Sequence, residues 1–381
     1  MVNNMSNLEL KLNRQVFLSA LYKAQGVVDR KSTVNVLSHL YMETTGSGRL
    51  ALTGTDFDVV LNSEFDVDMI SSGKACVNGK SIFDVVKNID DEIVHLKLMD
   101  NNWMELRGGR SSFKLAGINP VDFPEVESPD AVNWLAFPRS VISDFIDKTS
   151  FSVSGDETRM NLNGVFMKVS PADNGLANLT MVSTDGHRLS KVELPTEVKG
   201  YEGQTVEAIV HKKGVQELKR LLDGDELEIG IGFARGFILF KSGDTVLTVR
   251  QIEDSYPDYE RVIPPSSPVK LTIDKSRLVG AIKRMAILTS NKTYIVKMEL
   301  GKDKMSFTSS TPEYGEGRDE VDVSYDGEII TIGFNYSYLL DVFGALRGDT
   351  VTLELSDEYG PTVISSPAEP GALFVVMPMR I

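Results

Sequence analysis

Cysteine and histidine are scarce in this chain of 381 residues, and long apolar runs are absent. The single cysteine, Cys76, excludes an internal disulfide and a metal site built from cysteines. Four histidines, at positions 39, 95, 187 and 211, give little support for a metal cluster. No apolar run approaches the roughly 20 residues that a membrane-spanning helix needs, and residues 1–10 lack the features of a signal peptide. We therefore expect a cytoplasmic protein that uses no cofactor and contacts no membrane.

Positive charge is also in deficit. The chain has 40 basic and 54 acidic residues, which gives a formal net charge of −14. Taken alone, this balance argues against a nucleic-acid partner, because binding to phosphates is driven by cations. However, six windows with helical patterning contain 15 basic and only 6 acidic residues, namely 13–28, 80–89, 138–148, 211–222, 274–286 and 336–347.

The acidic residues of these windows include a single glutamate, Glu217. Lysine and glutamate are similarly good helix formers, so helix propensity alone does not explain the bias. One interpretation is that helix surfaces simply carry lysine and arginine. The other, which we favour, is a basic helical face that follows a polyanion such as duplex DNA without reading its bases.

An amphipathic segment at Leu12–Val28 occurs three times in the chain. Segments at Phe137–Phe151 and Ile273–Leu288 align with it without a gap, which places Arg14, Arg139 and Lys275 at one shared position. A second helical pattern recurs at 80–89, 212–222 and 336–347. A threonine that ends a predicted strand recurs as Thr55, Thr184 and Thr311.

The spacing of all three features is roughly 130 residues, far above the period of solenoid repeats. It predicts an α+β protein with three similar domains, each with two helices packed on antiparallel strands. We expect the domains at 1–130, 131–265 and 266–381. Proline-bearing stretches at 119–130 and 256–268 are predicted linkers, and Gly230–Gly236 is predicted to be a turn.

Several short motifs carry a family resemblance. The most specific are Thr184–Leu189 (TDGHRL), Tyr256–Val262 (YPDYERV) and Val375–Ile381 (VVMPMRI). Because these motifs occur in this order and at this spacing, the chain resembles the bacterial DNA polymerase III beta subunit family, the sliding clamps, over essentially its full length.

The resemblance implies a head-to-tail homodimer that closes a ring of six domains around double-stranded DNA without sequence preference. Such a heterologous interface gives a closed ring only if the rotation that relates one subunit to the next brings the last subunit back to the first. The family is not catalytic. It tethers the DNA polymerase III alpha subunit and other proteins with clamp-binding motifs, and it depends on a separate ATP-driven clamp loader. We therefore expect a processivity factor of the cytoplasm, associated with the nucleoid.

The resemblance also implies an apolar partner-peptide pocket, in which methionines adapt to different ligands. At the shared turn, only the second repeat has the residues Gly-His-Arg. The matching pocket residues are Leu162, Thr184, Gly186, His187, Arg188, Leu189, Pro257, Arg261, Val262, Val375, Val376, Met377, Pro378, Met379 and Arg380.

Two further sets of residues follow from the resemblance. The DNA-binding positions are Arg30, Lys80, Arg110, Lys212 and Lys213. Near the DNA, relatives often carry glutamine and paired tyrosines where this chain has Asp156, Met160 and Asn161. The dimer-interface positions are Phe113 and Leu115 on one side and Ile287 and Leu288 on the other, for which internal core is the alternative.

Two other functions remain open from the residues alone. Asp185 could orient His187 as the general base of a hydrolase, although Asp-Gly is also ordinary hairpin-turn chemistry. No Gly-x-Ser-x-Gly motif or nucleophilic cysteine accompanies this pair. The third possibility is a β-rich adhesion scaffold, which the basic helices disfavour.

Overall fold

The computed structural model describes residues 8–28, 34–46, 48–126, 129, 132–289 and 294–381. It contains two compact units. The first comprises Met1–Ser143, Val198–Glu202 and Lys213–Gln251, and the second comprises Asp144–Glu197, Gly203–Lys212 and Ile252–Ile381. The division passes through the second repeat. Among the described residues, no helix has both the length and the apolar character to span a membrane.

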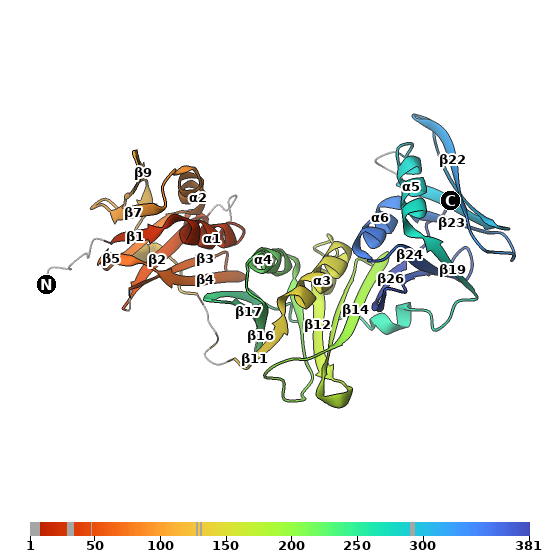
Figure 1. Ribbon diagram of the computed structural model, residues 1–381, viewed down its shortest axis with the longest axis horizontal. Helices are drawn as coiled ribbons and strands as arrows, with labels where there is room; N and C mark the ends of the chain where they lie inside the picture. Colours follow the sequence, from red (N-terminus) through yellow and green to blue (C-terminus); the bar gives the residue numbers. More distant parts are fainter. Residues whose placement is uncertain (1–7, 29–33, 47, 127–128, 130–131, 290–293) are drawn as a thin grey trace. The chain divides into compact units, whose positions relative to one another are not determined.

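The first unit holds two antiparallel sheets, with strand orders β5-β1-β7-β8-β9 and β10-β6-β2-β3-β4-β18-β17-β16-β11 (Figure 1). Its first-repeat elements are β1 (Glu9–Asn13), α1 (Arg14–Ala24), β2 (His39–Thr45), β3 (Arg49–Thr55), β4 (Val59–Asp66), β5 (Asp68–Ser71), β6 (Lys74–Asn78), α2 (Gly79–Asn88), β7 (Ile93–Leu98), β8 (Met104–Gly108), β9 (Ser111–Leu115) and β10 (Gly117–Ile118). The second repeat contributes β11 (Trp134–Pro138), most of α4 (Lys212–Leu222), β16 (Glu228–Ala234), β17 (Phe237–Ser242) and β18 (Thr245–Arg250).

The second unit also holds two antiparallel sheets, ordered β15-β12-β13-β14-β26-β25-β24-β19 and β22-β21-β20-β23. Helix α3 (Arg139–Thr149) spans the division between the units. The remaining elements are β12 (Gly164–Pro171), β13 (Ala177–Thr184), β14 (Arg188–Thr196), β15 (Val206–His211), β19 (Val269–Asp274), α5 (Lys275–Ala286), β20 (Ile295–Gly301), β21 (Lys304–Thr311), β22 (Gly315–Asp322), β23 (Ile330–Asn335), α6 (Tyr336–Ala345), β24 (Thr350–Leu355), β25 (Thr362–Ser366) and β26 (Glu369–Val376).

The fold is therefore α+β with three similar repeats, as predicted, and each repeat has two helices. Helix α1 packs beside α2, and α5 packs beside α6. The apolar stripe of α1 places Phe17 and Leu21 in the core with no exposed surface. The recurring threonines Thr55, Thr184 and Thr311 are the last residues of β3, β13 and β21.

In the first repeat the helix predicted from Leu12 begins one strand too early, whereas the helical windows 138–148 and 274–286 agree with the starts of α3 and α5 to within one residue. Leu12, Phe137 and Ile273 lie in β1, β11 and β19, and the helices begin only after those strands. In the first repeat the side chain of Asn13 accepts hydrogen bonds from the backbone amides of Gln15 and Val16, which caps the helix and ends the strand. Apolar residues alternate through the strand and continue into the helical stripe, so the pattern alone hides the boundary.

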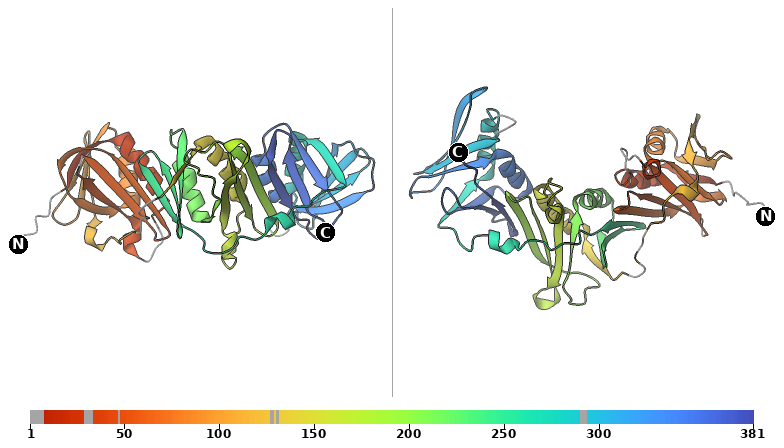
Figure 2. Two further views of the ribbon diagram at one scale, coloured as in Figure 1. Left: turned by 90° about the horizontal axis from the view of Figure 1, so that it is seen from below. Right: turned by 180° about the vertical axis from the view of Figure 1, so that it is seen from behind.

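Strand pairing joins consecutive repeats. Strand β4 of the first repeat pairs with β18 of the second, and Val60 faces Thr248. In the same way β14 of the second repeat pairs with β26 of the third, and Leu189 faces Val375. The second of these pairs is visible where the yellow-green strands run beside the blue ones (Figure 2). Strands β9 and β22 remain at the edges of their sheets.

Three predicted irregular stretches have more structure than expected. Gly230–Gly236 is not simply a turn, because residues up to Ala234 belong to β16. The stretch after the second repeat packs on its sheet, with the Tyr256 ring stacked 5.0 Å from that of Phe166. The stretch after the first repeat does the same, with Phe123 stacked 5.3 Å from Tyr41. Aromatic burial therefore anchors both predicted linkers to their sheets.

Candidate functional site

The turn from Thr184 to Arg188 joins β13 to β14. The Thr184 hydroxyl accepts from the amide of Gly186 at 3.1 Å and donates to the carbonyl of Arg188 at 2.6 Å. The Asp185 carboxylate accepts from the backbone amides of His187 at 2.9 Å and Arg188 at 3.0 Å. Gly186 has a φ of 88°, which glycine adopts without strain. The Asp-Gly pair thus forms a hairpin turn. Its carboxylate holds the backbone of His187 and does not orient the imidazole as a hydrolase would.

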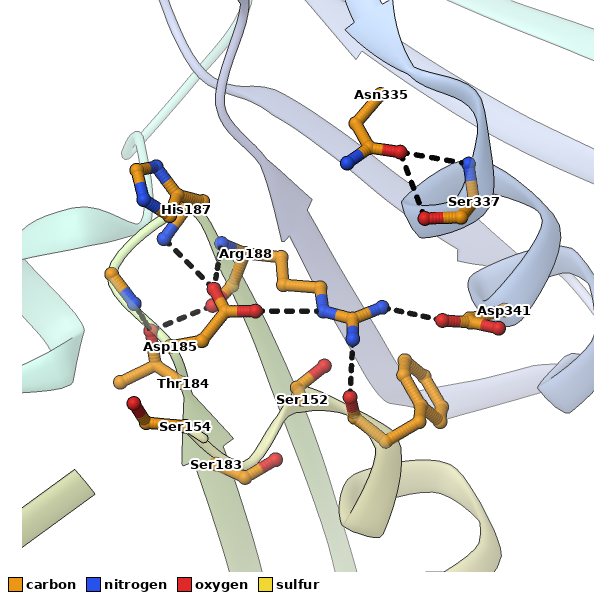
Figure 3. A network of polar contacts seen from close by, with 12 residues as sticks. Ser152, Ser154, Ser183, Thr184, Asp185, His187, Arg188, Asn335, Ser337 and Asp341 are labelled. Atoms are coloured by element: carbon orange, nitrogen blue, oxygen red, sulfur yellow. Dashed lines mark hydrogen bonds and ion pairs between the residues drawn. The ribbon is translucent and has the colours of Figure 1, made fainter. Parts of the chain in front are cut away.

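Arg188 fastens this turn to α6 (Figure 3). Its guanidinium donates to Asp185 at 3.0 Å, to Asp341 at 2.6 Å and to the carbonyl of Phe151. It lies 4.3 Å from the ring centre of Tyr338, close enough for a cation–π contact. The side chain is only 10% exposed. Arg188 therefore positions the turn, whereas the sequence suggested only that it lines the pocket.

Sequence reasoning assigned no role to Asp341, Tyr338 or Phe151. They lie far from Arg188 in the chain, and only the fold brings them together.

The C-terminal residues run along the same turn. The amide of Met377 donates to the carbonyl of His187 at 2.8 Å, and the amide of Met379 donates to the carbonyl of Gly333 in β23 at 2.8 Å. Val375 and Val376 are buried, whereas Met379 is 36% exposed. The tail is thus held at two points by its backbone, and its last residues face solvent.

A buried cluster of Phe166, Val182, Leu189, Ile209 and Val375 lies beneath the site. The side chains of Tyr256 and Tyr259 cover it, and burial raises the pKa of the Tyr256 hydroxyl. Two of the sequence-predicted pocket residues, Leu189 and Val375, belong to this cluster. Leu162, Leu189, Val375 and Val376 are buried, Thr184, Arg188, Met377 and Pro378 are half-buried, and the exposed members are Gly186, His187, Pro257, Arg261, Val262, Met379 and Arg380. The structure therefore brings all fifteen predicted positions into the second unit, around the β14–β26 pair.

Three family models match consecutive parts of the chain. They describe the N-terminal, central and C-terminal domains of the DNA polymerase III beta subunit and match residues 8–127, 136–258 and 260–380. The chain belongs to the DNA polymerase III beta subunit family. Its function is that of a DNA sliding clamp for DNA polymerase III.

Individual relatives agree with this assignment. The beta sliding clamp of Caulobacter vibrioides is 31% identical over 98% of this chain and 100% of the relative. That of Pseudomonas aeruginosa is 32% identical over 97% of this chain and 99% of the relative. A crystal structure of the Caulobacter crescentus clamp covers 99% of this chain and 100% of its own, with a TM-score of 0.92 and 31% identity.

The three aligned cations of this family member cap helices. Arg14 at the start of α1 donates to the carbonyls of Val86 at 3.0 Å and Lys87 at 2.7 Å, at the end of α2. Arg139 donates to the last carbonyl of α4, that of Leu222, at 2.6 Å, and Lys275 donates to Leu346, just after α6, at 2.6 Å. A cation at a helix C-terminus satisfies free carbonyls and the helix dipole. Their recurrence therefore has a structural cause and is not by itself evidence for a DNA-facing surface.

Other helix cations are also paired within the chain. Lys148 is 2% exposed, and its amine lies 2.5 Å from Asp144 and 2.6 Å from Glu369. Arg220 lies 2.7 Å from the buried Glu217. Part of the basic enrichment therefore neutralises buried carboxylates.

The predicted DNA-binding residues differ in their surroundings. Lys80 and Lys212 are exposed at the starts of α2 and α4, and Arg110 is exposed in the turn between β8 and β9. Lys213 is half-buried and forms an ion pair with Asp56. Arg30 lies outside the described residues. Of the departures from the family pattern, Met160 is 65% exposed, and the side-chain amide of the half-buried Asn161 donates to the carbonyl of Ser255 at 3.4 Å.

The predicted interface residues lie at the surface. Phe113 in the edge strand β9 is 37% exposed, and Ile287 just after α5 is 75% exposed. Leu115 and Leu288 are partly exposed. The alternative that Phe113 and Ile287 are internal core is therefore wrong.

Proposed function

We propose that this chain is a non-catalytic processivity subunit that encircles duplex DNA as a head-to-tail homodimer and tethers the DNA polymerase III alpha subunit. A clamp loader opens it, and other proteins with clamp-binding motifs share its pocket. The domains are 1–130, 131–265 and 266–381, and the protein acts in the cytoplasm at the nucleoid. The observation that carries the ring is the repeated strand junction.

The junctions follow one rule. In each, the strand after a recurring threonine pairs with the last long strand of the next repeat, as β4 does with β18 and β14 with β26. The third such strand is β22, which follows Thr311 and is an edge strand, and the last long strand of the first repeat, β9, is also an edge. Pairing β22 of one copy with β9 of another applies the rule a third time and gives a heterologous contact.

The first junction also supplies a register. There the fourth residue after the threonine, Val59, faces Val249, which is the fifth residue of β18. The equivalent pair places Gly315 opposite Leu115, and the next pair places Glu316 opposite Lys114. Opposite charges that face each other across strands are stabilising.

The following pair in this register is Gly317 and Phe113. A Cβ atom on Gly317 would lie 2.5 Å from the side chain of Leu288, so a larger residue there would require the Leu288 side chain to move. Glycine in a strand often marks a close approach by another chain segment. Phe113 of one copy then packs over Gly317 against Leu288 of the other.

Native mass spectrometry tests the dimer, which should have about twice the chain mass of 42.0 kDa. Glu316→Lys should weaken the dimer by placing two cations opposite each other, and adding Lys114→Glu should restore it. A monomeric wild type contradicts the ring. Failure of the double variant to recover contradicts the register.

Retention on DNA tests encirclement. The loaded protein should stay on nicked circular DNA and be lost when the circle is linearised, because a ring slides off a free end. Equal retention on both forms would show that phosphate contacts alone hold the protein.

Phosphate contacts are assigned to Arg30, Lys80, Arg110, Lys212 and Lys213. Replacing the exposed Lys212 by alanine should weaken binding equally for all sequences and reduce the salt slope by about 1. A salt slope equal to that of the wild type would remove Lys212 from this set.

The pocket around β14 and β26 is assigned to a short partner peptide with apolar anchors. The buried leucines and valines form its floor, and the exposed His187, Val262 and Met379 form its rim. Deleting Met377–Ile381 should abolish binding of a polymerase peptide while the dimer persists. Leu227→Ala, which removes an 83% exposed side chain in the first unit, is the control and should leave peptide affinity unchanged. Unchanged affinity after the deletion contradicts the pocket.

A further inference from the structure

The first unit has a small cleft next to the turn between β3 and β4. Its volume is about 150 Å³, and its main lining residues are Phe57, Asp58, Glu125, Val126, Phe237 and Arg250. A cavity of about this size holds one benzene-sized group, so it suits the ring or branched chain of a single residue.

This cleft occupies the same place in the first repeat as the proposed partner pocket does in the second. Both adjoin a Thr-Asp turn and a junction between repeats, where Val60 faces Thr248 just as Leu189 faces Val375. Both are flanked by a segment that an aromatic stack fixes to the sheet. The repeat therefore supplies the pocket architecture twice.

Phe57 lines the first cleft in an unusual backbone conformation. Its φ of 78° lies in the left-handed region, where the equivalent residue, Gly186, has a φ of 88°. A bulky residue is strained in this conformation, yet the Phe57 side chain is 52% exposed. Burial within the chain thus offsets little of the strain, and strained residues of this kind cluster at ligand-binding sites.

The two sites carry different charged side chains. In the first cleft, Arg250 lies over the Phe237 ring at 5.1 Å and its Nε lies 3.7 Å from the carboxylate of Asp58. A second carboxylate, that of Glu125, is exposed in the lining, so this cleft has an excess of negative charge. The exposed residues assigned to the second-unit pocket instead include Arg380 and Arg261, and Arg261 pairs with Asp258 at 2.7 Å.

We propose that this first-unit cleft is a second docking site, which takes a peptide segment of a protein partner with one aromatic or leucine side chain flanked by basic residues. The apolar side chain enters between Phe57 and Phe237, and the flanking cations meet Asp58 and Glu125. This site is distinct from the pocket in the second unit and has the opposite charge preference.

Fluorescence anisotropy on the intact protein tests the proposal with two labelled peptides. They share a Leu-Phe core, which is flanked by lysines in one and by glutamates in the other. The lysine-flanked peptide should bind more tightly at this site. Phe57→Gly should weaken its binding about tenfold or more, as loss of an aromatic anchor does. Glu125→Lys should also weaken it, and it should improve binding of the glutamate-flanked peptide.

Two controls separate this site from other binding. His187→Ala changes only the second-unit pocket and should leave affinity for the lysine-flanked peptide unchanged. A lysine-flanked peptide whose core is replaced by serines reports attraction to the acidic protein alone and should not bind measurably. Equal binding of that serine peptide, loss of binding on His187→Ala, or insensitivity to Phe57→Gly would each overturn the proposal.

Discussion

The turns that follow β3 and β13 have one backbone design and different side chains. In both, a threonine hydroxyl and an aspartate carboxylate accept backbone amides, at 2.9 and 2.8 Å for Thr55 and Asp56. The aspartates then differ in their partner. Asp56 pairs with Lys213 of α4, whereas Asp185 pairs with Arg188 of its own turn, which in turn reaches Asp341 of α6.

In each case a cation links the turn to a helix of the next repeat. The third turn, Thr311-Pro312, has no aspartate. The primary role of the Thr-Asp turn is therefore structural, because it connects one repeat to a helix of the next. The two turns differ at the next two positions, which are Phe57 and Asp58 in the first turn and Gly186 and His187 in the second.

The largest expected loss of stability comes from breaking the contacts of Arg188, which connect the second turn to α6. Arg188→Met leaves the carboxylates of Asp185 and Asp341 without their partner, and the Arg188–Asp185 pair is 10% and 15% exposed. Removing one partner of a buried pair costs about 3 to 5 kcal/mol. Urea denaturation should show this loss, and hydrogen exchange should speed up in β14 and α6 but not in α1.

Arg188→Lys is the matched control for geometry. It keeps the charge but lacks the planar fork that reaches several acceptors at once, so it should recover only part of the lost stability. Full recovery would mean that charge alone fastens the turn.

Breaking the ion pair between Asp56 and Lys213, which connects the first turn to α4, should reduce the free energy of unfolding by less. Lys213→Met frees Asp56, but the lysine side chain is 29% exposed, so water replaces part of the lost interaction. We expect a loss of about 1 to 2 kcal/mol. Faster hydrogen exchange should appear at the β3–β4 turn. A loss as large as that of Arg188→Met would contradict the difference in burial.

Much of the fold was predictable because its signals are local. The six helices and the positions of Thr55, Thr184 and Thr311 follow from periodic apolar residues and from short motifs that recur. The strands β1, β11 and β19, which precede the first helix of each repeat, were missed because Leu12 and its equivalents continue the apolar pattern through the boundary.

The candidate site was less predictable, because its decisive contacts join distant segments. Arg14 bonds to Val86, 72 residues away, so the sequence showed an aligned cation without its acceptor. Arg188 matched a family pocket, but its burial against Tyr338 depends on the packing of α6. Residue type and position in the sequence therefore identified which residues belong to the candidate site. Only the fold distinguished a residue that positions the turn, such as Arg188, from the residues that are exposed at its surface.

The glycine of the second turn offers a smaller test. In Gly186→Ala, a Cβ atom at a φ of 88° is strained and meets the guanidinium of Arg159 at 2.6 Å, although that flexible side chain can move. We expect a stability loss of about 1 to 2 kcal/mol from the left-handed conformation. Gly155→Ala is the control, since a Cβ atom there meets nothing within 4 Å. Equal losses in the two variants would contradict a specific role for the turn.

The reverse change in the first turn should have the smallest effect. Phe57→Gly removes left-handed strain but adds backbone freedom to the unfolded chain, and these two terms have opposite signs and similar size. Because the ring is 52% exposed, little packing is lost. The free energy of unfolding should therefore stay within about 1 kcal/mol of the wild type. Urea denaturation measures this value, and a larger loss would show that Phe57 is kept for packing within the chain, as an ordinary structural residue is.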